Sequence, residues 1–432
     1  MSRDFTSLFK LVLLGILIIL LALPAVQAKW HFLTVRPLHG YFELSPRPAF
    51  TWTDLRANTY QGRIEKYLDD RLGFREWAIR SRNQIAYTLF GVVHANDVIL
   101  GQRNVLYQGG PVEAYLGHDY LGPEEIRIHA QRVRNVQDSL ARHGVEFLYV
   151  IAPGKPRFQP EDLPPHVKEM WPNPTNYAGF AAALPKVGVH VLDIASLFQK
   201  WKPKAAHPLF PRGGTHWSCY GITLAADTLF GAIESLTRVD LPSFKTTPGI
   251  ITTDSLRSTD NDIVQGLNLI WEPTPYPMAY PILTFAPLAP SQQRLNMLLI
   301  GDSFAQSLYL YYPYLQNMLD SRSSRFWYYN EYTYWPATPP DESRVVHELN
   351  LREQVEKQQL VVVFATEQNL SKRSFGFIDE VYNTYHPVTA AGEARIQKLM
   401  KQYKAELSWE ESTKITDEQL HQRAILQYER ER

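Results

Sequence analysis

Four short apolar runs constrain the fold of this chain more than any other feature. They are VEFLYVIAP (145–153), GVHVLDI (188–194), NMLLIGDS (296–303) and LVVVFATE (360–367). Stretches of helical pattern lie between them, and one more precedes them over 123–143, with a proline at its start and a glycine just past its end. Continuous apolar runs separated by helical stretches predict a parallel sheet with helices covering both faces. Such a sheet places its ligand site at the carboxyl ends of the strands.

Composition supports a folded protein and removes several classes of function. Of the 432 residues, 45% are apolar and 20% are charged, which suffices for a core. Lys plus Arg and Asp plus Glu are both 44, so the basic surplus typical of nucleic-acid binding is absent and no nucleic-acid partner is expected. The single cysteine, Cys219, excludes an internal disulfide and a multi-cysteine metal site. No metal or nucleotide motif is present, so we expect neither a metal nor a cofactor.

The amino terminus indicates where the protein resides. Residues 11–26 form an unbroken apolar run, with Arg3 and Lys10 on its amino-terminal side and small residues at its end. A signal peptide cleaved after Ala28 and an uncleaved membrane anchor both fit this pattern. In either case the positive flank predicts that everything from Lys29 onward is exported.

The pattern along the chain predicts four parts. Residues 1–28 are the signal peptide or anchor, 29–110 a membrane-proximal helical lead-in, 111–390 the α/β domain, and 391–432 a charged helical tail. Within the lead-in, Gly73 is expected to divide the helical pattern into two helices.

The first candidate for chemistry is Ser303, which follows Gly301 and Asp302 at the end of an apolar run. A serine at a strand-to-helix turn presents its hydroxyl above the sheet, near helix amides that stabilise an anionic oxygen. Gly301 permits the tight turn. The alternative is that Asp302 and Ser303 simply cap a helix. The Gly-x-Ser-x-Gly motif is absent, which disfavours the standard α/β-hydrolase.

The second candidate is His216, in the loop GGTHWS (213–218). A serine nucleophile needs a general base, and a histidine in a Gly-rich loop can supply one. The alternative is a structural histidine. Cys219 lies three residues later and is either a thiol nucleophile or an ordinary small buried residue.

Several segments together resemble the alginate O-acetyltransferase family, the group containing AlgJ and AlgX. They are YLDDRLGFREWAIRSRNQIAYTLFGV (67–92), APGKPRFQPEDLP (152–164), LFPRGGTHWSCYG (209–221), DNDIVQGLNL (260–269), IGDSFAQSL (300–308) and FATEQNL (364–370). The resemblance implies an SGNH-hydrolase-like α/β fold in a permuted order, in which the histidine motif precedes the serine. The order of His216 and Ser303 fits.

Carried over, the resemblance makes Ser303 the nucleophile and His216 its general base. The family usually has Asp-x-His, where the acid orients the imidazole, but here that position is Gly214. Loss of such a carboxylate costs about 10⁴ in rate in serine proteases. Three explanations stay open: another acid substitutes, a backbone carbonyl holds the ring, or catalysis is weak. Glu367 is the candidate acid; otherwise it is a solvent-facing residue at a strand end.

Four further residues are candidates for binding the oxyanion or the substrate. SGNH-like sites use an asparagine amide as an oxyanion donor, which makes Asn330 and Asn369 candidates beside the Gly301 turn. Tyr329 ends another predicted strand, RFWYYNE (325–331), among several tyrosines. These rings form either a floor that stacks on sugars or a set of half-buried strand positions.

The leading hypothesis is an exported O-acetyltransferase of exopolysaccharide biosynthesis. The resemblance implies that a membrane-bound O-acyltransferase partner supplies the acetyl group, that Ser303 carries it as an acyl-enzyme, and that a hydroxyl of a secreted or envelope polysaccharide accepts it. The protein would be periplasmic, tethered to the bacterial inner membrane, or released into the periplasm if cleaved after Ala28. One rival is a polysaccharide acetylesterase, with water as acceptor. The other is a catalytically inactive glycan-binding or assembly protein of an acetylation complex.

Overall fold

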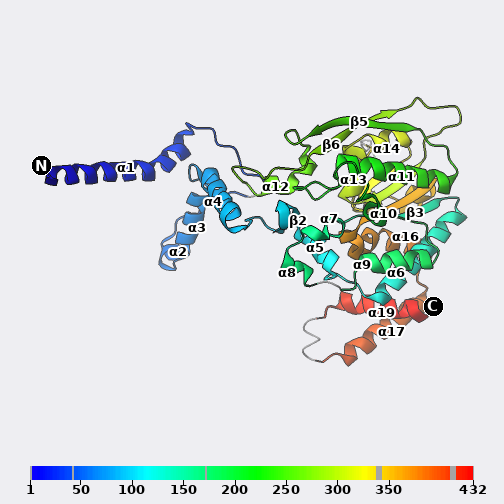
Figure 1. Cartoon of the computed structure of the whole chain (residues 1–432). Helices are drawn as coiled ribbons and strands as arrows, with labels where there is room; N and C mark the ends of the chain where they lie inside the picture. Colours follow the sequence, from blue (N-terminus) through cyan, green and yellow to red (C-terminus); the bar gives the residue numbers. More distant parts are fainter. Residues whose placement is uncertain (1, 41–42, 171–172, 337–342, 409–414, 432) are drawn as a thin grey trace. The chain divides into compact units, whose positions relative to one another are not determined.

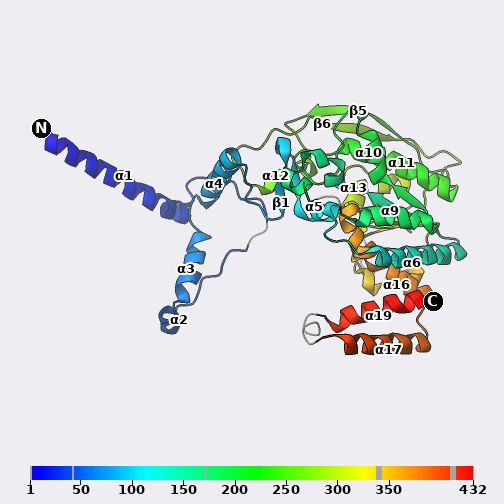
Figure 2. The same cartoon turned by 60° about the horizontal axis from the view of Figure 1, so that its bottom comes forward.

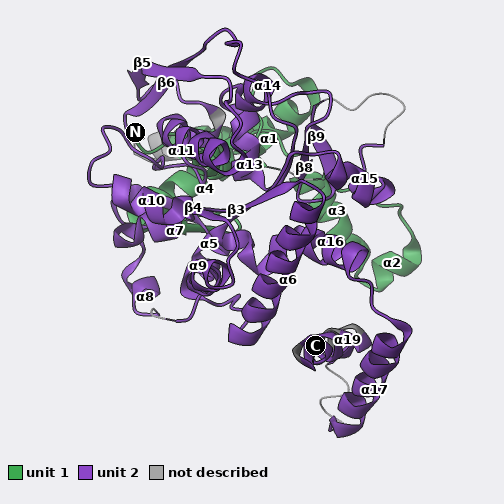
Figure 3. Cartoon of the chain, turned by 90° about the vertical axis from the view of Figure 1, so that its right-hand side faces the viewer, with its two compact units in different colours: residues 1–100, 261–274 green, residues 101–260, 275–432 purple. Residues whose placement is uncertain are grey.

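The computed structural model describes residues 2–40, 43–170, 173–336, 343–408 and 415–431. The chain divides into two compact units, coloured separately in Figure 3. Unit 1 is residues 1–100 with 261–274, and unit 2 is residues 101–260 with 275–432. The domain boundaries proposed from the sequence remain a prediction.

Unit 1 is built from helices. Its elements are α1 (Ser2–Trp30), α2 (Trp52–Arg56), α3 (Tyr60–Asp69), α4 (Arg75–Phe90), β1 (Val98–Leu100) and α12 (Asp262–Gly266). The long α1 forms the N-terminal end of the chain in Figure 1. Its part Ser7–Trp30 is long and apolar enough to cross a membrane, and none of its most apolar window is buried. The predicted break at Gly73 falls between α3 and α4.

The last two turns of α1 pack against the α3–α4 junction. A Cβ on Gly73 would lie 2.2 Å from the Pro24 carbonyl oxygen, so only glycine fits there. Gln27 is 4% exposed. Its Nε2 donates to the Leu33 carbonyl at 2.7 Å, and its Oε1 accepts from the Leu33 N–H at 3.1 Å. The end of this helix is therefore a structural part of unit 1.

Unit 2 contains the predicted sheet. Its six strands are arranged in the order β4-β3-β10-β7-β8-β9. Their bounds are β4 (Val191–Asp193), β3 (Glu146–Ala152), β10 (Leu360–Thr366), β7 (Met297–Gly301), β8 (Arg325–Tyr328) and β9 (Tyr332–Trp335). Neighbours from β4 to β8 are parallel, and only β9 runs antiparallel. All four apolar runs are strands of this sheet, so the predicted fold class is confirmed.

Helices cover both faces of the sheet (Figures 1 and 2). Successive strand residues alternate between two cores; Val362 of β10 belongs to one and Val363 to the other. The first core is covered by α10 (Ile194–Trp201), α11 (Cys219–Thr237), α13 (Ser303–Leu310) and α14 (Tyr314–Met318). The second is covered by α6 (Pro123–Arg142), α9 (Asn176–Lys186) and α16 (Phe377–Tyr385). Parallel strands buried on both faces explain the unbroken apolar runs.

Shorter elements complete the unit. They are β2 (Leu106–Gln108), α5 (Gly109–Leu116), α7 (Lys155–Phe158), α8 (Pro165–Lys168), α15 (Leu351–Glu356), and the 3₁₀ segment η5 (Glu367–Gly376). A two-stranded antiparallel sheet, β5 (Phe244–Thr252) with β6 (Met278–Phe285), packs against the first core. The sequence analysis did not predict this pair of strands.

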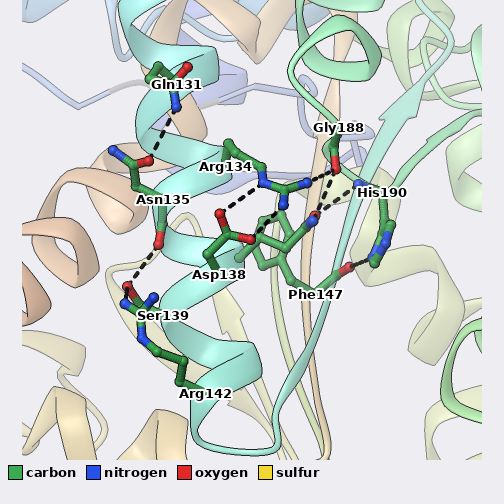
Figure 4. A network of polar contacts seen from close by, with 10 residues as sticks. Gln131, Arg134, Asn135, Asp138, Ser139, Arg142, Phe147, Gly188 and His190 are labelled. Atoms are coloured by element: carbon green, nitrogen blue, oxygen red, sulfur yellow. Dashed lines mark hydrogen bonds and ion pairs between the residues drawn. The ribbon is translucent and has the colours of Figure 1, made fainter.

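Polar contacts fix the outer edge of the sheet, as Figure 4 shows. Arg134 on α6 donates to the Gly188 carbonyl at 2.7 Å, and Gln137 donates to the same oxygen at 3.1 Å. His190, just before β4, contacts the Phe147 carbonyl at 3.2 Å through Nδ1. These bonds place the short strand β4 beside β3.

The C-terminal segment forms the helices α17 (Ala390–Glu406) and α19 (Asp417–Glu431). They lie side by side in Figures 1 and 2. A small core of its own joins them, with Ile396, Leu399 and Ala424 buried. The helical character expected for residues 391–432 is present over these two ranges.

Candidate active site

Ser303 is the first residue of α13, two residues after the end of β7. It therefore lies at the carboxyl edge of the parallel sheet, where ligand sites of such sheets form. Gly301 is needed just before it, because a Cβ there would lie 2.5 Å from Ala305 Cβ and 3.0 Å from the Phe364 carbonyl oxygen. The Ser303 side chain itself is only half-buried.

Asp302 caps this helix and ties it to the neighbouring strand. Its side chain is fully buried. Oδ1 accepts from the Phe304 N–H at 3.0 Å, while Oδ2 accepts from the Thr366 N–H at 2.8 Å and from Asn369 Nδ2 at 2.8 Å. The helix-cap interpretation thus applies to Asp302, and it leaves the Ser303 hydroxyl available for other contacts.

The loop before α11 brings His216 to Ser303. The distance between His216 Nε2 and Ser303 Oγ is 2.9 Å. The imidazole ring also packs against Phe304, with 5.0 Å between ring centroids. A base within hydrogen-bond distance of a hydroxyl is the arrangement that activates a serine nucleophile.

Trp217 fastens this loop to the helix that carries Ser303. It is fully buried, and its indole Nε1–H donates to Ser307 Oγ, one turn along α13, at 2.8 Å. Ser218 then caps α11 by accepting from the Gly221 N–H at 2.8 Å. The Trp217 indole therefore anchors the loop in the core.

Lys155 supports the same loop through hydrogen bonds to its backbone. This residue was not identified from the sequence. Its side chain is buried, and Nζ donates to the carbonyls of Leu106 at 2.7 Å, Arg212 at 2.9 Å and Gly214 at 2.7 Å. The only sequence signal was a lysine directly after an apolar strand, in APGKP. A buried ammonium satisfied by carbonyls holds the backbone that leads into His216.

Tyr329 also lies at Ser303. Its backbone has a left-handed φ of 53°, and its N–H donates to the Gly301 carbonyl at 2.9 Å. Burial raises the pKa of its hydroxyl to about 12, against hydrogen bonds from Asn369 and Ser303 that lower it. The phenol stays protonated at neutral pH and can donate a hydrogen bond at the serine. A left-handed backbone conformation is energetically unfavourable at a tyrosine. Such backbone strain is found most often at functional sites.

Other tyrosines extend from Tyr329 along the sheet edge. Tyr328 packs against Tyr329, Tyr332 and Tyr334, with ring centroids 4.6, 5.5 and 5.9 Å apart. Lys372 Nζ lies 4.6 Å from the Tyr329 ring centroid. Tyr332 is 38% exposed, so the cluster reaches the surface.

Two candidates have different surroundings from those expected. Asn330 directs its Nδ2 to the Phe375 carbonyl and to Glu380, each at 3.3 Å, and neither bond reaches Ser303. Asn369 is close, but its Nδ2 donates to Asp302 at 2.8 Å and to Thr366 Oγ1 at 3.0 Å. These bonds brace the turn, and the Asn369 side chain also hydrogen-bonds the Tyr329 hydroxyl beside Ser303.

Glu367 is neither solvent-facing nor bonded to His216. It is 2% exposed, and Oε1 accepts from Arg157 Nε at 2.8 Å and Nη2 at 2.5 Å. Burial raises the pKa of this carboxyl, and Arg157 opposes that shift. No hydrogen bond or ion pair joins Glu367 to His216 among the described residues. The sequence-based role as orienting acid is therefore not supported by the geometry.

Cys219 is fully buried at the start of α11. Burial raises the pKa of its thiol to about 12, so it is not a thiolate nucleophile. Among the described residues, no group of three or more His, Cys, Asp or Glu side chains is arranged to hold a metal ion.

The comparisons with known proteins cover the part of the chain that holds this site. Residues 115–328, which include His216 and Ser303, match the family model described as "SGNH hydrolase-like domain, acetyltransferase AlgX". The chain is 24% identical over 177 residues to the probable alginate O-acetylase AlgJ of Azotobacter vinelandii, covering 40% of this chain and 42% of that protein. It is 27% identical over 181 residues to the corresponding protein of Pseudomonas putida, covering 41% and 44%.

The matched region thus spans less than half the length of these relatives. Among solved structures, the O-acetyltransferase domain of Pseudomonas putida AlgJ has a TM-score of 0.43 at 19% identity, covering 66% of this chain and 99% of that one. Pseudomonas aeruginosa AlgX has a TM-score of 0.42 at 15% identity, covering 69% and 70%. The family model and the AlgJ relatives confirm the resemblance to AlgJ and AlgX predicted from the sequence motifs.

Proposed function

We propose that this chain, whose residues 115–328 form an AlgX-type SGNH hydrolase-like domain, is an exported polysaccharide O-acetyltransferase. One observation carries the proposal: His216 Nε2 lies 2.9 Å from Ser303 Oγ at the carboxyl edge of the sheet. The acetylase names of the AlgJ relatives support acetyl as the transferred group.

The first half-reaction loads the serine. Ser303 Oγ attacks the acetyl carbonyl carbon while its proton passes to His216 Nε2. The bond from the acetyl group to its donor then breaks, and the departing oxygen or sulfur takes the proton from His216. The Tyr329 hydroxyl donates to the carbonyl oxygen as negative charge develops on it.

The second half-reaction transfers the acetyl group from Ser303 to the acceptor. A sugar hydroxyl gives its proton to His216 and attacks the acetyl-serine, and Ser303 Oγ recovers the proton as the ester bond breaks. With water as the acceptor, the same residues release acetate, so an acetylesterase is the alternative enzyme. The tyrosine cluster of Tyr328, Tyr329, Tyr332 and Tyr334 favours the sugar acceptor, because aromatic faces pack well against sugar rings.

Helix α1 holds the protein at the inner membrane in this proposal. The burial of Gln27 and the fit of Gly73 against Pro24 support retention of the helix, because cleavage after Ala28 removes both contacts. A retained anchor keeps the serine on the periplasmic side, close to a membrane-bound O-acyltransferase that supplies acetyl groups. N-terminal mass analysis of the membrane fraction tests this: an intact terminus is expected, and a terminus at Lys29 contradicts it.

The enzymatic proposal is tested by isolating the acyl-enzyme. The full chain in detergent is treated with p-nitrophenyl acetate and examined by intact-mass spectrometry. We expect an adduct of roughly 42 Da, one acetyl group in place of hydrogen, that disappears in Ser303→Ala. Ser235→Ala is the matched control, because Ser235 is exposed on α11. An adduct absent from the wild type, or one that persists in Ser303→Ala, overturns the proposal in favour of a non-catalytic binding protein.

The transferase and the esterase separate in a second measurement. The acetylated enzyme is offered a soluble oligosaccharide in water, and both acetate and acetylated sugar are quantified. Transfer that rises with sugar concentration at the expense of acetate supports the transferase. Release of acetate alone supports the esterase.

A further inference from the structure

The loop before His216 lacks space for the acid that the family usually places there. A Cβ on Gly214 would lie 2.2 Å from the Thr259 carbonyl oxygen and 3.0 Å from the Asp260 carbonyl carbon. No side chain fits at that distance without moving backbone. The space that an aspartate at this position occupies is therefore filled by residues 259 and 260 of another segment.

The segment that contains residues 259 and 260 also contacts the chain just after His216 in the sequence. Arg257 Nη1 contacts Cys219 Sγ at 3.2 Å, three residues after the histidine. Gly214, two residues before it, contacts Thr259 and Asp260. Residues 257–260 therefore lie beside the loop that carries His216, at Gly214 and at Cys219.

Asp260 is the buried carboxylate of this segment that the mechanism has not used. It is 0% exposed, and Oδ2 accepts from the Tyr280 hydroxyl at 2.6 Å. The hydrogen bond and the charge of Asp260 both raise the pKa of Tyr280, after burial as the main cause. A charge kept inside a protein needs polar partners around it.

The imidazole of His216 has a second ring nitrogen that a carboxylate can hold. Because Nε2 faces Ser303, the other ring nitrogen, Nδ1, points to the opposite side of the ring. A carboxylate at Nδ1 keeps the proton there, leaves Nε2 as the acceptor for the serine, and stabilises the imidazolium that forms. Lys155 holds the Gly214 carbonyl at 2.7 Å, so the loop keeps its place relative to residues 257–260.

We propose that Asp260 is the positioning residue of His216, having taken over the role of the acid that Gly214 replaces. This inference rests on the proposed function, since it assigns the partner of the general base in that reaction. The acid then comes from a separate segment and not from the histidine loop. The reaction still uses a serine, a histidine and a carboxylate.

Several charged or titratable groups surround this pair and enter the interpretation of any pH profile. Arg257, Cys219, Tyr280 and Tyr312 act on or near Asp260. Lys155 and Tyr329 lie near the His216–Ser303 side. Burial raises the pKa values of Cys219, Tyr280 and Tyr312, so these three stay neutral between pH 5 and 9.

The test compares acetylation rates of Ser303 in the wild type and Asp260→Asn. The amide has the same size and still accepts from Tyr280, so the change removes mainly the charge. We expect a rate loss of about 10³- to 10⁴-fold at pH 7. We also expect the midpoint of the pH–rate profile to fall, because removal of a negative charge disfavours the imidazolium form of the base. A purely structural role leaves that midpoint in place.

A proton NMR measurement separates this inference from the proposed function. A histidine Nδ1–H bonded to a carboxylate gives a low-field resonance, which we expect in the wild type and not in His216→Gln or Asp260→Asn. If the wild type shows the resonance but forms no acyl-enzyme, the proposed function is overturned while the pairing of Asp260 with His216 is retained. An acyl-enzyme formed at the wild-type rate and pH profile by folded Asp260→Asn overturns the pair alone. If Asp260→Asn does not fold, absence of the resonance from the wild type overturns it.

Discussion

Two neighbouring turns at the carboxyl edge of the sheet have similar sequences and different surroundings. The turn after β7 begins with Asp302 and the turn after β10 with Glu367, and both carboxylates are buried, at 0% and 2% exposed. Asp302 accepts from the Phe304 N–H of its own helix and from the Thr366 N–H and Asn369 amide of the adjacent turn. Glu367 instead pairs with the guanidinium of Arg157.

The difference arises from what crosses each turn. The loop anchored by Trp217 passes over the turn after β7 and delivers His216 to Ser303. Helix α7 passes over the turn after β10 and delivers Arg157, whose guanidinium also lies 4.2 Å from the Tyr177 ring centroid. An acid after a buried strand therefore becomes part of a reactive site or of a buried ion pair, depending on the segment that covers it.

The largest effect should distinguish the two turns by activity. His216→Ala removes the only base bonded to the serine among the described residues, and we expect the acetylation rate of Ser303 to fall about 10⁴- to 10⁶-fold. Glu367→Gln should change that rate less than about threefold, since its partner is Arg157. Stopped-flow release of p-nitrophenol measures both. If both variants lose the same amount of acetylation rate, the two turns do not differ in activity, and Glu367 takes part in the reaction.

The next effect should distinguish the turns by stability. Arg157→Leu leaves the Glu367 carboxylate buried and unpaired, so the free energy of unfolding should fall by about 3–5 kcal/mol. The loss should be greater at pH 8 than at pH 5, because a carboxyl whose pKa is raised in the native state loses stability as pH rises.

Urea unfolding at the two pH values measures the difference. The double variant Arg157→Leu/Glu367→Leu is the matched control and should recover most of the loss, because no charge then remains buried. A single variant as stable as the wild type shows that the pair contributes nothing.

These two turns also show what the sequence could predict. The strands were predictable because a strand buried on both faces is a local, continuous apolar run. The His216–Ser303 pair was predictable because a Gly-rich loop and a strand-end serine carry recognisable chemistry and match one family. Tyr329 was a sequence candidate for binding the oxyanion or the substrate, and that role stays a prediction; its hydroxyl shares a hydrogen bond with Ser303.

The partners of the strand-end side chains were not predictable in the same way. Arg157 and Glu367 are 210 positions apart, and Asn330 meets groups 45 and 50 positions away. Such contacts depend on which loops lie next to each other in the folded protein. No local sequence pattern encodes this arrangement. The brace from Lys155 was missed for the same reason, because its three carbonyl acceptors come from two distant segments.

A smaller effect should appear in acid on the β10 side. His129 on α6 contacts Ser374 of η5 at 3.0 Å, and burial lowers the pKa of this histidine to about 4. Between pH 6.5 and 4 the unfolded chain therefore binds a proton that the native state does not. We expect the free energy of unfolding to fall by up to about 3 kcal/mol across that range.

His129→Gln should flatten this dependence, which urea unfolding at pH 7, 5.5 and 4.5 measures. Hydrogen exchange locates the effect: residues 367–376 should lose protection in acid before residues 301–307. Simultaneous loss in both turns indicates global unfolding and contradicts the assignment to the β10 side.

The smallest effect compares two glycines, Gly301 before the turn after β7 and Gly154, which packs against Glu367 of the turn after β10. In Gly301→Ala the new methyl meets Ala305 Cβ at 2.5 Å and the Phe364 carbonyl at 3.0 Å, both on rigid elements, so about 1–3 kcal/mol of stability should be lost. In Gly154→Ala the nearest atom is Glu367 Oε2 at 3.0 Å, the end of a side chain that can shift. That variant should lose less than about 1 kcal/mol, because its backbone, with φ of −85°, suits any residue. Thermal unfolding of both proteins gives the two values. A larger loss in Gly154→Ala means that the Arg157–Glu367 turn is the more rigid of the two, and that the turn carrying Ser303 can rearrange around an added methyl.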